Sequence, residues 1–442
     1  MTNFDIILKG GELVLPNKKI DKLDVGISNC LIKEIGDLSK MSADKIIDIT
    51  GLTVMPGAID TQVHFREPGL THKEDIKHGS KGAVAGGVTT FFEMPNTIPP
   101  TTCARELEKK FQIAEKNSFC NYSFFVGASK ENIREIRELE SFPGCCGVKI
   151  FMGSSTGDLL VEDDNSVLEI LKLSKKMIAV HSEDEYRLRL RAKEFSENKL
   201  SVFNHPEIRD TVSAVNCTKR LLKLAHEAKK KIHILHLSTN DEVELLANNK
   251  DIATCEVTPQ HLFFNSPECY KKLGTFSQMN PPIRDKTHNL GLWDGLSQKV
   301  IDVIGSDHAP HTIQEKNKSY PDSPSGMTGV QTLLPIMLNF VNEGKLSIFD
   351  LVKLVCENPC KIYSIMNKGK IQIDYDADLT VIDLNKEFTI TNDWIHSKSK
   401  WTPYDGVKIK GIPVFTIVNG KLAMEENQII NEVAGKKVLF KD

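Results

Sequence analysis

The stretch "GAIDTQVHFREPG", residues 57–69, runs from small and apolar residues into a polar segment that contains proline and glycine. This pattern predicts a buried strand that ends in a loop. Gln62 and His64 lie two residues apart, and side chains two apart on a strand point to the same side. Two imidazoles in this arrangement would be ready metal ligands, but here one partner is an amide. The chain is therefore either a metalloenzyme with an altered site or the shell of one.

Seven further apolar runs follow this first run, "AIDTQVHF", along the chain: "VTTFFEM", "YSFFVGA", "GVKIFM", "MIAVHSE", "IHILHLS", "IATCEVTP" and "VIDVIGSDH". Charged, helix-like stretches such as "SAVNCTKRLLKLAHEAKKK" separate many of these runs. Alternating strand and helix patterns predict βα units and a parallel sheet. Eight units over about 250 residues are typical of a (β/α)8 TIM-type barrel. An open doubly wound sheet is the competing α/β fold.

Short strand patterns recur at both ends of the chain, with "DIILKGGELV" near the start and "ADLTVIDLN" and "FTIVNGKLA" near the end. They predict a small β domain assembled from the two terminal segments. We place this domain at residues 1–54 and 370–442, and the barrel at residues 55–369.

Composition excludes several classes of protein. The net charge of −3 and the pI of about 6.5 give no basic footprint for nucleic acid or an anionic membrane. No apolar run approaches the length of a membrane span, and the first residues lack the pattern of a secretory signal. The ten cysteines are scattered without CxxC pairs, which favours reduced thiols. We therefore expect a cytoplasmic protein with no nucleic acid or membrane partner.

Reactive side chains gather at the ends of the predicted strands, where a barrel brings catalytic groups together on one face. These residues are Gln62, His64, Lys149, His181, His236, Asp307 and His308. Each residue alone has an ordinary structural explanation, such as a surface histidine or a capping aspartate. Their combined placement at five strand ends favours one site. Imidazoles and a carboxylate are normal ligands of a divalent metal of the zinc type.

Lys149 does not fit such a site as an ammonium group, because a cation does not bind a metal ion. Reaction of its amine with carbon dioxide would give a carbamate, an anion with two oxygens that can bridge two metals. The sequence alone leaves this modification open.

With these residues in hand, the chain resembles the dihydroorotase family of the amidohydrolase superfamily. The motifs match in the family's order and span essentially the whole chain: "VHFREPGLTHKEDI", "EMPNT", "HLST", "EVTPQHL", "NPPIRD" and "SDHAPH". "HFREPG" and "MPNT" distinguish this family from hydantoinases and allantoinases, which remain the nearest alternative enzymes. The resemblance implies reversible hydrolysis of dihydroorotate to N-carbamoyl aspartate in pyrimidine biosynthesis by a metal-activated hydroxide.

The resemblance also implies roles for the metal ligands. His64 and Asp307 would bind one zinc ion and His181 and His236 a second, with carboxylated Lys149 as the bridge. The site would thus hold one or two Zn²⁺ and need carbon dioxide. Asp307 would also be the catalytic proton carrier.

The same resemblance implies four substrate-binding residues. Arg66, Asn96 and His311 would hold the substrate carboxylate, and Asn280 would help to bind the ring. Arginine suits planar recognition of a carboxylate. On position alone, Arg66 could also form a surface ion pair, Asn96 could start a turn, and His311 could be a loop residue.

The family usually has histidine where this chain has Gln62, and a second such departure is Gln260 in "EVTPQHL". Three interpretations follow. The enzyme could work with one tight metal or an exchangeable pair. Gln62 could be a weak ligand through its oxygen or could orient a water. The chain could instead be a non-catalytic partner of aspartate transcarbamoylase. We expect retained activity, because the other reactive residues all remain, and we expect a homo-oligomer. The role of the polar stretch "STGDLLVEDD" (155–164) stays undecided.

Overall fold

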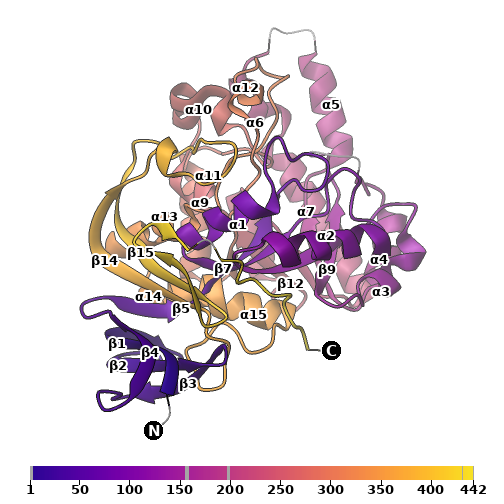
Figure 1. Cartoon of the computed structure of the whole chain (residues 1–442). Coiled ribbons are helices and arrows are strands. Elements are labelled where there is room, and N and C mark those ends of the chain that lie inside the picture. The colour runs from indigo at the N-terminus through magenta and orange to yellow at the C-terminus, as the bar shows by residue number, and fades with distance from the viewer. Residues whose placement is uncertain (1–2, 155–158, 197–199, 431, 442) are drawn as a thin grey trace.

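The computed structural model (Figure 1) describes residues 3–154, 159–196, 200–430 and 432–441. The described chain forms an eight-stranded sheet and a nine-stranded sheet. The first sheet is the predicted barrel, and the second is built from the two terminal segments, so the predicted fold class is confirmed. The first four residues of the stretch 155–164 lie outside the described residues.

Each of the eight predicted runs overlaps one barrel strand. The strands are β6 (Ala58–Val63), β7 (Val88–Glu93), β8 (Asn121–Gly127), β9 (Cys145–Phe151), β10 (Met177–His181), β11 (Ile232–Ile234), β12 (Ala253–Val257) and β13 (Val303–Ile304). They pair in chain order, all parallel. The first and last strands meet through the His64 N–H, which donates to the His308 carbonyl at 2.7 Å. This contact brings residues far apart in sequence to one end of the barrel.

Helices follow the strands and surround the sheet (Figure 1). They are α1 (Ile76–Ala85), α2 (Ala104–Asn117), α3 (Ile136–Leu139), α4 (Asp164–Leu173), α5 (Glu185–Phe195), α6 (His205–Ile208), α7 (Thr211–Ala228), α8 (Asn240–Ala247), α9 (Pro259–Phe263), α10 (Glu268–Leu273), α11 (Lys286–Ser297), α12 (Ile313–Lys316), α13 (Leu333–Asn342), α14 (Ile348–Val352) and α15 (Asn358–Tyr363). Several begin at an aspartate whose side chain accepts a backbone N–H of the first turn, as Asp75 does for α1 and Asp210 for α7. Such caps satisfy donors that the helix itself leaves unpaired. No helix of the described chain has both the length and the apolar character needed to cross a membrane.

The second sheet joins both ends of the chain, with the early strands and the late strands side by side (Figure 1). Its strands are β1 (Asn3–Leu15), β2 (Lys19–Ser28), β3 (Leu31–Gly36), β4 (Ser42–Asp48), β5 (Thr53–Pro56), β14 (Leu379–Thr389), β15 (Lys408–Val418), β16 (Lys421–Glu425) and β17 (Gln428–Ile429). The join is the pair β14 and β5, which is antiparallel. Part of this sheet packs around an apolar cluster separate from the barrel core. The exact domain boundaries stay a prediction.

The last residues of the chain leave this sheet and run along the barrel. The Tyr122 N–H at the start of β8 donates to the Lys436 carbonyl, and the Val438 N–H donates back to Tyr122. Phe440 forms an isolated bridge with Ile365, just after α15, where Figure 1 places the C-terminus. The tail therefore lies at the N-terminal end of the barrel strands.

Candidate active site

Most of the predicted site residues meet in one cavity at the C-terminal end of the barrel, whereas Arg66, Asn96 and His311 are not part of its lining. Those that line it are Gln62, His64, Lys149, His181, His236, Asn280 and Asp307. Phe151, Ala309, Ser325 and Gly326 complete its wall. Parallel strands place their carboxyl ends at the same edge of a barrel, which is why these side chains converge.

Two pairs of reactive groups face each other in this cavity. His64 Nε2 lies 3.2 Å from Asp307 Oδ1, and His181 Nδ1 lies 3.0 Å from His236 Nε2. All four side chains are buried. Burial, with a smaller contribution from neighbouring cations, lowers the pKa of each of the three imidazoles below its usual value. They are therefore neutral, which is the form that binds a metal.

Hydrogen bonds fix which nitrogen of two imidazoles faces the cavity. Asn96 Oδ1 accepts from His64 Nδ1 at 2.7 Å, so Nε2 keeps its lone pair on the side of Asp307. Glu183 Oε2 lies 2.9 Å from His181 Nε2, which leaves His181 Nδ1 facing His236. Metal-binding histidines are commonly oriented in this way by a partner on the other nitrogen.

Lys149 is the fully buried cation of the cavity, with 1% of its surface exposed. Its Nζ has no hydrogen-bond partner and lies 4.5 Å from the centroid of the Phe151 ring. Burial lowers the pKa of this amine to about 7. The neutral amine, which is the nucleophilic form, is thus well populated near neutral pH.

Gln62 and Asp307 are held together. Gln62 Nε2 donates to Asp307 Oδ1 at 3.0 Å, while Gln62 Oε1 has no hydrogen-bond partner. Burial raises the pKa of Asp307 to about 7, against the opposing effect of Lys149 and His181. A carboxylate with such a pKa can both accept and release a proton near neutral pH. Gln260 does not line the cavity; its amide donates to the Ser306 carbonyl at 2.9 Å.

The residues present fit a divalent metal ion. Among the described residues that line the cavity, four buried polar atoms have neither a hydrogen-bond nor an ion-pair partner: Gln62 Oε1, Lys149 Nζ, His236 Nδ1 and Asn280 Oδ1. A buried polar atom without a partner costs free energy of folding unless a bound ligand interacts with it. The donor set of neutral imidazoles and a carboxylate is the one that zinc prefers.

Arg66 lies next to this cavity with only 2% of its surface exposed. Its Nε donates to the Pro310 carbonyl at 3.2 Å, and a terminal nitrogen lies 3.3 Å from His311 Nε2. No carboxylate of the described residues forms an ion pair with it. Burial lowers the pKa of the guanidinium to about 10, so it stays charged at neutral pH. Among the described residues, this buried positive charge therefore has carboxylates in its surroundings but none in ion-pair contact.

Three residues of this region hold a left-handed backbone: Arg66 (φ 63°), His236 (φ 38°) and Asp307 (φ 45°). Such conformations are uncommon for residues other than glycine. They cost free energy and occur preferentially at functional sites. Their coincidence here supports the cavity as the working part of the molecule.

Sequence reasoning missed the groups that stand behind the predicted ligands. Glu183 lies against His181, and Arg209 Nε donates to both its carboxylate oxygens at 3.2 and 3.1 Å. Burial alone would raise the pKa of Glu183, but Arg209 and His181 hold it below its usual value. Lys73 Nζ likewise lies 3.1 Å from His311 Nδ1. The sequence "HSED" offered a signal, because Glu183 is two residues beyond His181.

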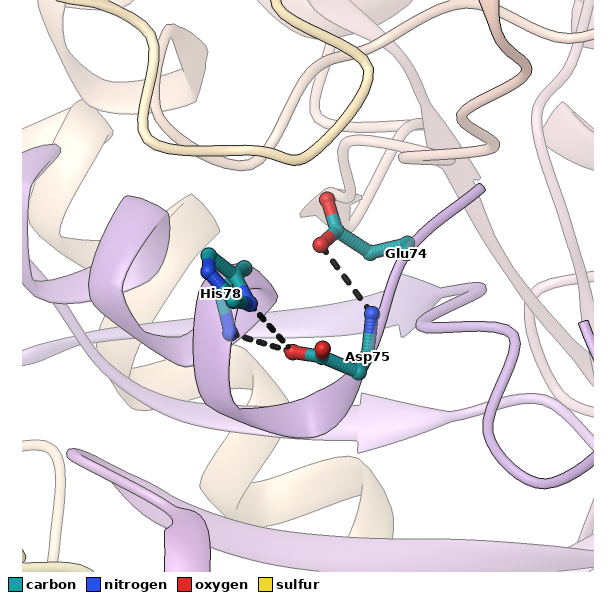
Figure 2. A group of neighbouring side chains, drawn as sticks. All are labelled: Glu74, Asp75 and His78. Carbon is teal, nitrogen blue, oxygen red and sulfur yellow. Dashed lines mark hydrogen bonds and ion pairs between the residues drawn. The ribbon is translucent and has the colours of Figure 1, made fainter. Parts of the chain in front are cut away.

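A second group of metal-ligand types lies before and within α1 (Figure 2). Ligand atoms of Glu74, Asp75 and His78 lie within 4.8 Å of one another. Asp75 Oδ1 already accepts from the His78 N–H and lies 2.7 Å from His78 Nδ1, and its Oδ2 lies 3.2 Å from Lys398 Nζ. Helix capping and the Lys398 ion pair account for this carboxylate. These residues do not line the cavity.

The sequence profile of the amidohydrolase family matches residues 53–423. The chain belongs to the amidohydrolase family, and the prediction of a metal-dependent cyclic amidohydrolase is confirmed at that level.

Named relatives agree with this assignment. A dihydroorotase of Methanosarcina mazei is 34% identical over 427 residues, which cover 93% of each chain. A dihydroorotase of Pyrococcus horikoshii is 34% identical over 99% of this chain and 96% of its own. Among solved structures, the L-hydantoinase (dihydropyrimidinase) from Arthrobacter aurescens superimposes with a TM-score of 0.94 at 30% identity, covering 99% of this chain and 100% of its own.

Proposed function

We propose that this amidohydrolase is a dihydroorotase, which opens and closes the six-membered ring of dihydroorotate to give N-carbamoyl aspartate. The observation that carries the proposal is Arg66, a buried guanidinium beside the cavity with no carboxylate partner among the described residues. The names of the relatives support the same substrate.

A buried charge without an ion-pair partner costs free energy, and a substrate carboxylate would supply that partner. Arg66 has two terminal nitrogens, and within the described part of the chain one of them has a side-chain hydrogen-bond contact, with His311. The planar guanidinium can accept a carboxylate in two parallel hydrogen bonds. His311 and Asn96 would border the same carboxylate, and Asn280, whose Oδ1 has no hydrogen-bond partner, would accept an N–H of the ring. Anchoring the substrate in this way lowers the entropic part of the barrier.

We propose that zinc binds between the two facing pairs. His64 and Asp307 would hold one ion and His181 and His236 a second. Lys149 would bridge them after its nitrogen adds to carbon dioxide and releases a proton. The lowered pKa of Lys149 supports this step, because only the neutral amine reacts. A bound divalent metal supplies a Lewis acid and lowers the pKa of water toward 7.

Asp307 would move the proton. Its carboxylate would accept a proton from the attacking water and return it to the leaving ring nitrogen, as a general base and then a general acid. Its raised pKa, about 7, supports both roles. Gln62 would position this carboxylate through its amide N–H and offer its free oxygen as a weak ligand. The substitution of the family's histidine would therefore loosen one metal position and keep the proton carrier in place.

The test is steady-state hydrolysis of L-dihydroorotate by the purified protein with zinc and bicarbonate. Turnover well above that of a His181→Ala control would establish the activity and show that Gln62 is tolerated. No turnover, together with no bound metal, would contradict the proposal. The chain would then be better described as a non-catalytic relative.

A hydantoinase or allantoinase activity is the second candidate, favoured by the close superposition on the L-hydantoinase. A hydantoin ring without a carboxylate would leave Arg66 unpaired. Relative rates on hydantoin, allantoin and dihydroorotate separate the candidates, and we expect dihydroorotate to be preferred.

We further propose a cytoplasmic protein that forms homo-oligomers and associates with an aspartate transcarbamoylase. All ten cysteines are free thiols, which supports a reducing compartment. Light scattering coupled to size exclusion, with and without a transcarbamoylase, tests the two assemblies.

A further inference from the structure

A second cavity lies at the opposite, N-terminal end of the barrel. Its volume is about 650 Å³, within the range of about 300–1,000 Å³ typical of small-molecule sites. Its wall includes the loops that precede β10 and β11, the end of α15 and the C-terminal tail. None of its residues belongs to the catalytic cavity.

The charged residues of this cavity are almost all positive. Six cations line it: Arg137, Lys175, Lys176, Lys230, Lys231 and Lys441. Within the described part of the chain, none of these six forms an ion pair. The chain as a whole carries a net charge of −3, so this concentration of positive charge is local. We call it the basic cavity.

The lining contains one acidic residue, Glu140, whose single negative charge offsets only one of the six positive charges. Both carboxylate oxygens of Glu140 are occupied, since they accept from the Ser174 hydroxyl and from the backbone N–H groups of Lys175 and Lys176. Two of the ammonium groups donate to backbone carbonyls: Lys176 Nζ to Cys145 at 2.7 Å, and Lys230 Nζ to Ser174 at 2.9 Å. These bonds fix the direction of two cations without cancelling their charge.

The topology explains why the charges meet. Lysine pairs directly precede the neighbouring parallel strands β10 and β11, as "KKMIAV" (175–180) and "KKIHIL" (230–235). Neighbouring parallel strands begin at the same edge of the sheet, so the two pairs lie together. The tail adds Lys441, because its N–H donates to the Ser364 carbonyl after α15 (Figure 1).

The floor of the basic cavity is apolar. Met177, Ile362, Tyr363 and Phe440 contribute to it, and Lys176 Nζ lies 5.1 Å from the centroid of the Phe440 ring. Low-dielectric walls around charges of one sign concentrate their field. Like charges held together in this way repel, and an anion with several charges would relieve that repulsion.

We propose that the basic cavity binds a small anion that carries a diphosphate or triphosphate group. Lys175, Lys176, Lys230 and Lys231 would contact the phosphate oxygens, and the apolar floor would receive any ring attached to them. This site is separate from the catalytic cavity and does not depend on the substrate proposed above.

The experiment is calorimetric titration of the full chain with pyrophosphate, with ADP and with inorganic phosphate at 0.15 M salt. The test variant is Lys175→Gln with Lys231→Gln, two exposed side chains whose loss leaves the core intact. The control variant is Lys271→Gln with Lys272→Gln, an adjacent exposed pair at the end of α10. Each variant removes two positive charges, so a change in overall charge affects both equally.

We expect pyrophosphate to bind, and the test variant to lose about tenfold or more in affinity, because charge-assisted hydrogen bonds are lost. The control variant should bind like the original chain. ADP binding more tightly than pyrophosphate would identify a nucleotide as the source, and equal affinities would identify the phosphate groups alone. Absence of pyrophosphate and ADP binding, or equal weakening in both variants, would overturn the proposal. Capture of an acidic protein or nucleic acid without binding of the small anions would also overturn it.

Discussion

The two ends of the barrel carry opposite kinds of cavity. At the C-terminal end the space is about 20 Å³ and its walls are buried imidazoles, a buried lysine and a buried carboxylate. At the N-terminal end the space is about 650 Å³, and lysines and an arginine line much of it. A search by size alone would choose the N-terminal cavity and pass over the candidate active site.

The different burial of the charged side chains explains the difference between the two cavities. At the C-terminal end burial moves the pKa of Lys149 and of Asp307 to about 7, so both groups can exchange protons at neutral pH. At the N-terminal end several lysine side chains are exposed to solvent, and their positive charges would attract an anion without reacting with it. The comparison predicts that substitutions at one end change turnover and that substitutions at the other change only binding.

The largest expected effect is at Asp307. Asp307→Asn removes the proton carrier while leaving the size of the side chain nearly unchanged, so we expect turnover of L-dihydroorotate to fall by about 10²–10⁴-fold. Zinc per chain, measured by atomic emission, should fall only in part. Asp294→Asn, an exposed acid on α11, is the matched control. Undiminished turnover in Asp307→Asn would remove this residue from the proton transfer.

A smaller but more selective effect is expected at Arg66. Arg66→Met keeps much of the side-chain volume and removes the charge. We expect kcat/KM for dihydroorotate to fall about 100-fold, because the two charge-assisted hydrogen bonds to the carboxylate would be lost. Activity on an uncharged ring such as dihydrouracil should fall much less. Equal losses on both rings would mean that Arg66 supports the cavity without recognising a carboxylate.

The sequence was sufficient for the barrel because its eight runs alternate with helical stretches. It also pointed to several residues that line one cavity, because barrel strands end on one face. The sequence could not show that Asn96 accepts from His64, since that contact joins the ends of two different strands. The sequence also did not show where the C-terminal tail lies. "KKVLF" resembles another strand of the β domain, but the tail packs against β8 and the segment after α15.

The residues that contact the predicted metal ligands were missed for a related reason. Glu183 contacts His181 and accepts from Arg209, which follows it by more than twenty residues. A periodic pattern cannot reveal a contact made by loops. The basic cavity is different, because the repeated Lys-Lys before two strands was visible, but only the structure brings the tail beside them.

Glu183 offers the next test of the C-terminal cavity. Glu183→Gln keeps the shape but weakens the acceptor for His181 Nε2, so we expect zinc affinity to fall about 10–100-fold, as for other residues that orient metal ligands. Competition with a coloured chelator measures this affinity directly. Excess zinc should restore most of the turnover, which a merely misfolded variant would not allow. Unchanged zinc affinity would show that Glu183 serves only the ion pair with Arg209.

The smallest expected effect lies at the other end of the barrel. Lys175→Gln with Lys231→Gln should leave turnover of L-dihydroorotate within about twofold, because neither residue lines the catalytic cavity. Removing two like charges from a concave surface should also raise stability at low salt by about 0.5 kcal/mol, and added salt should erase the difference because ions screen exposed charges. Thermal melts at 20 mM and 500 mM salt measure this. A large loss of turnover would mean that the two ends of the barrel are coupled, and the division between a reacting end and a binding end would no longer hold.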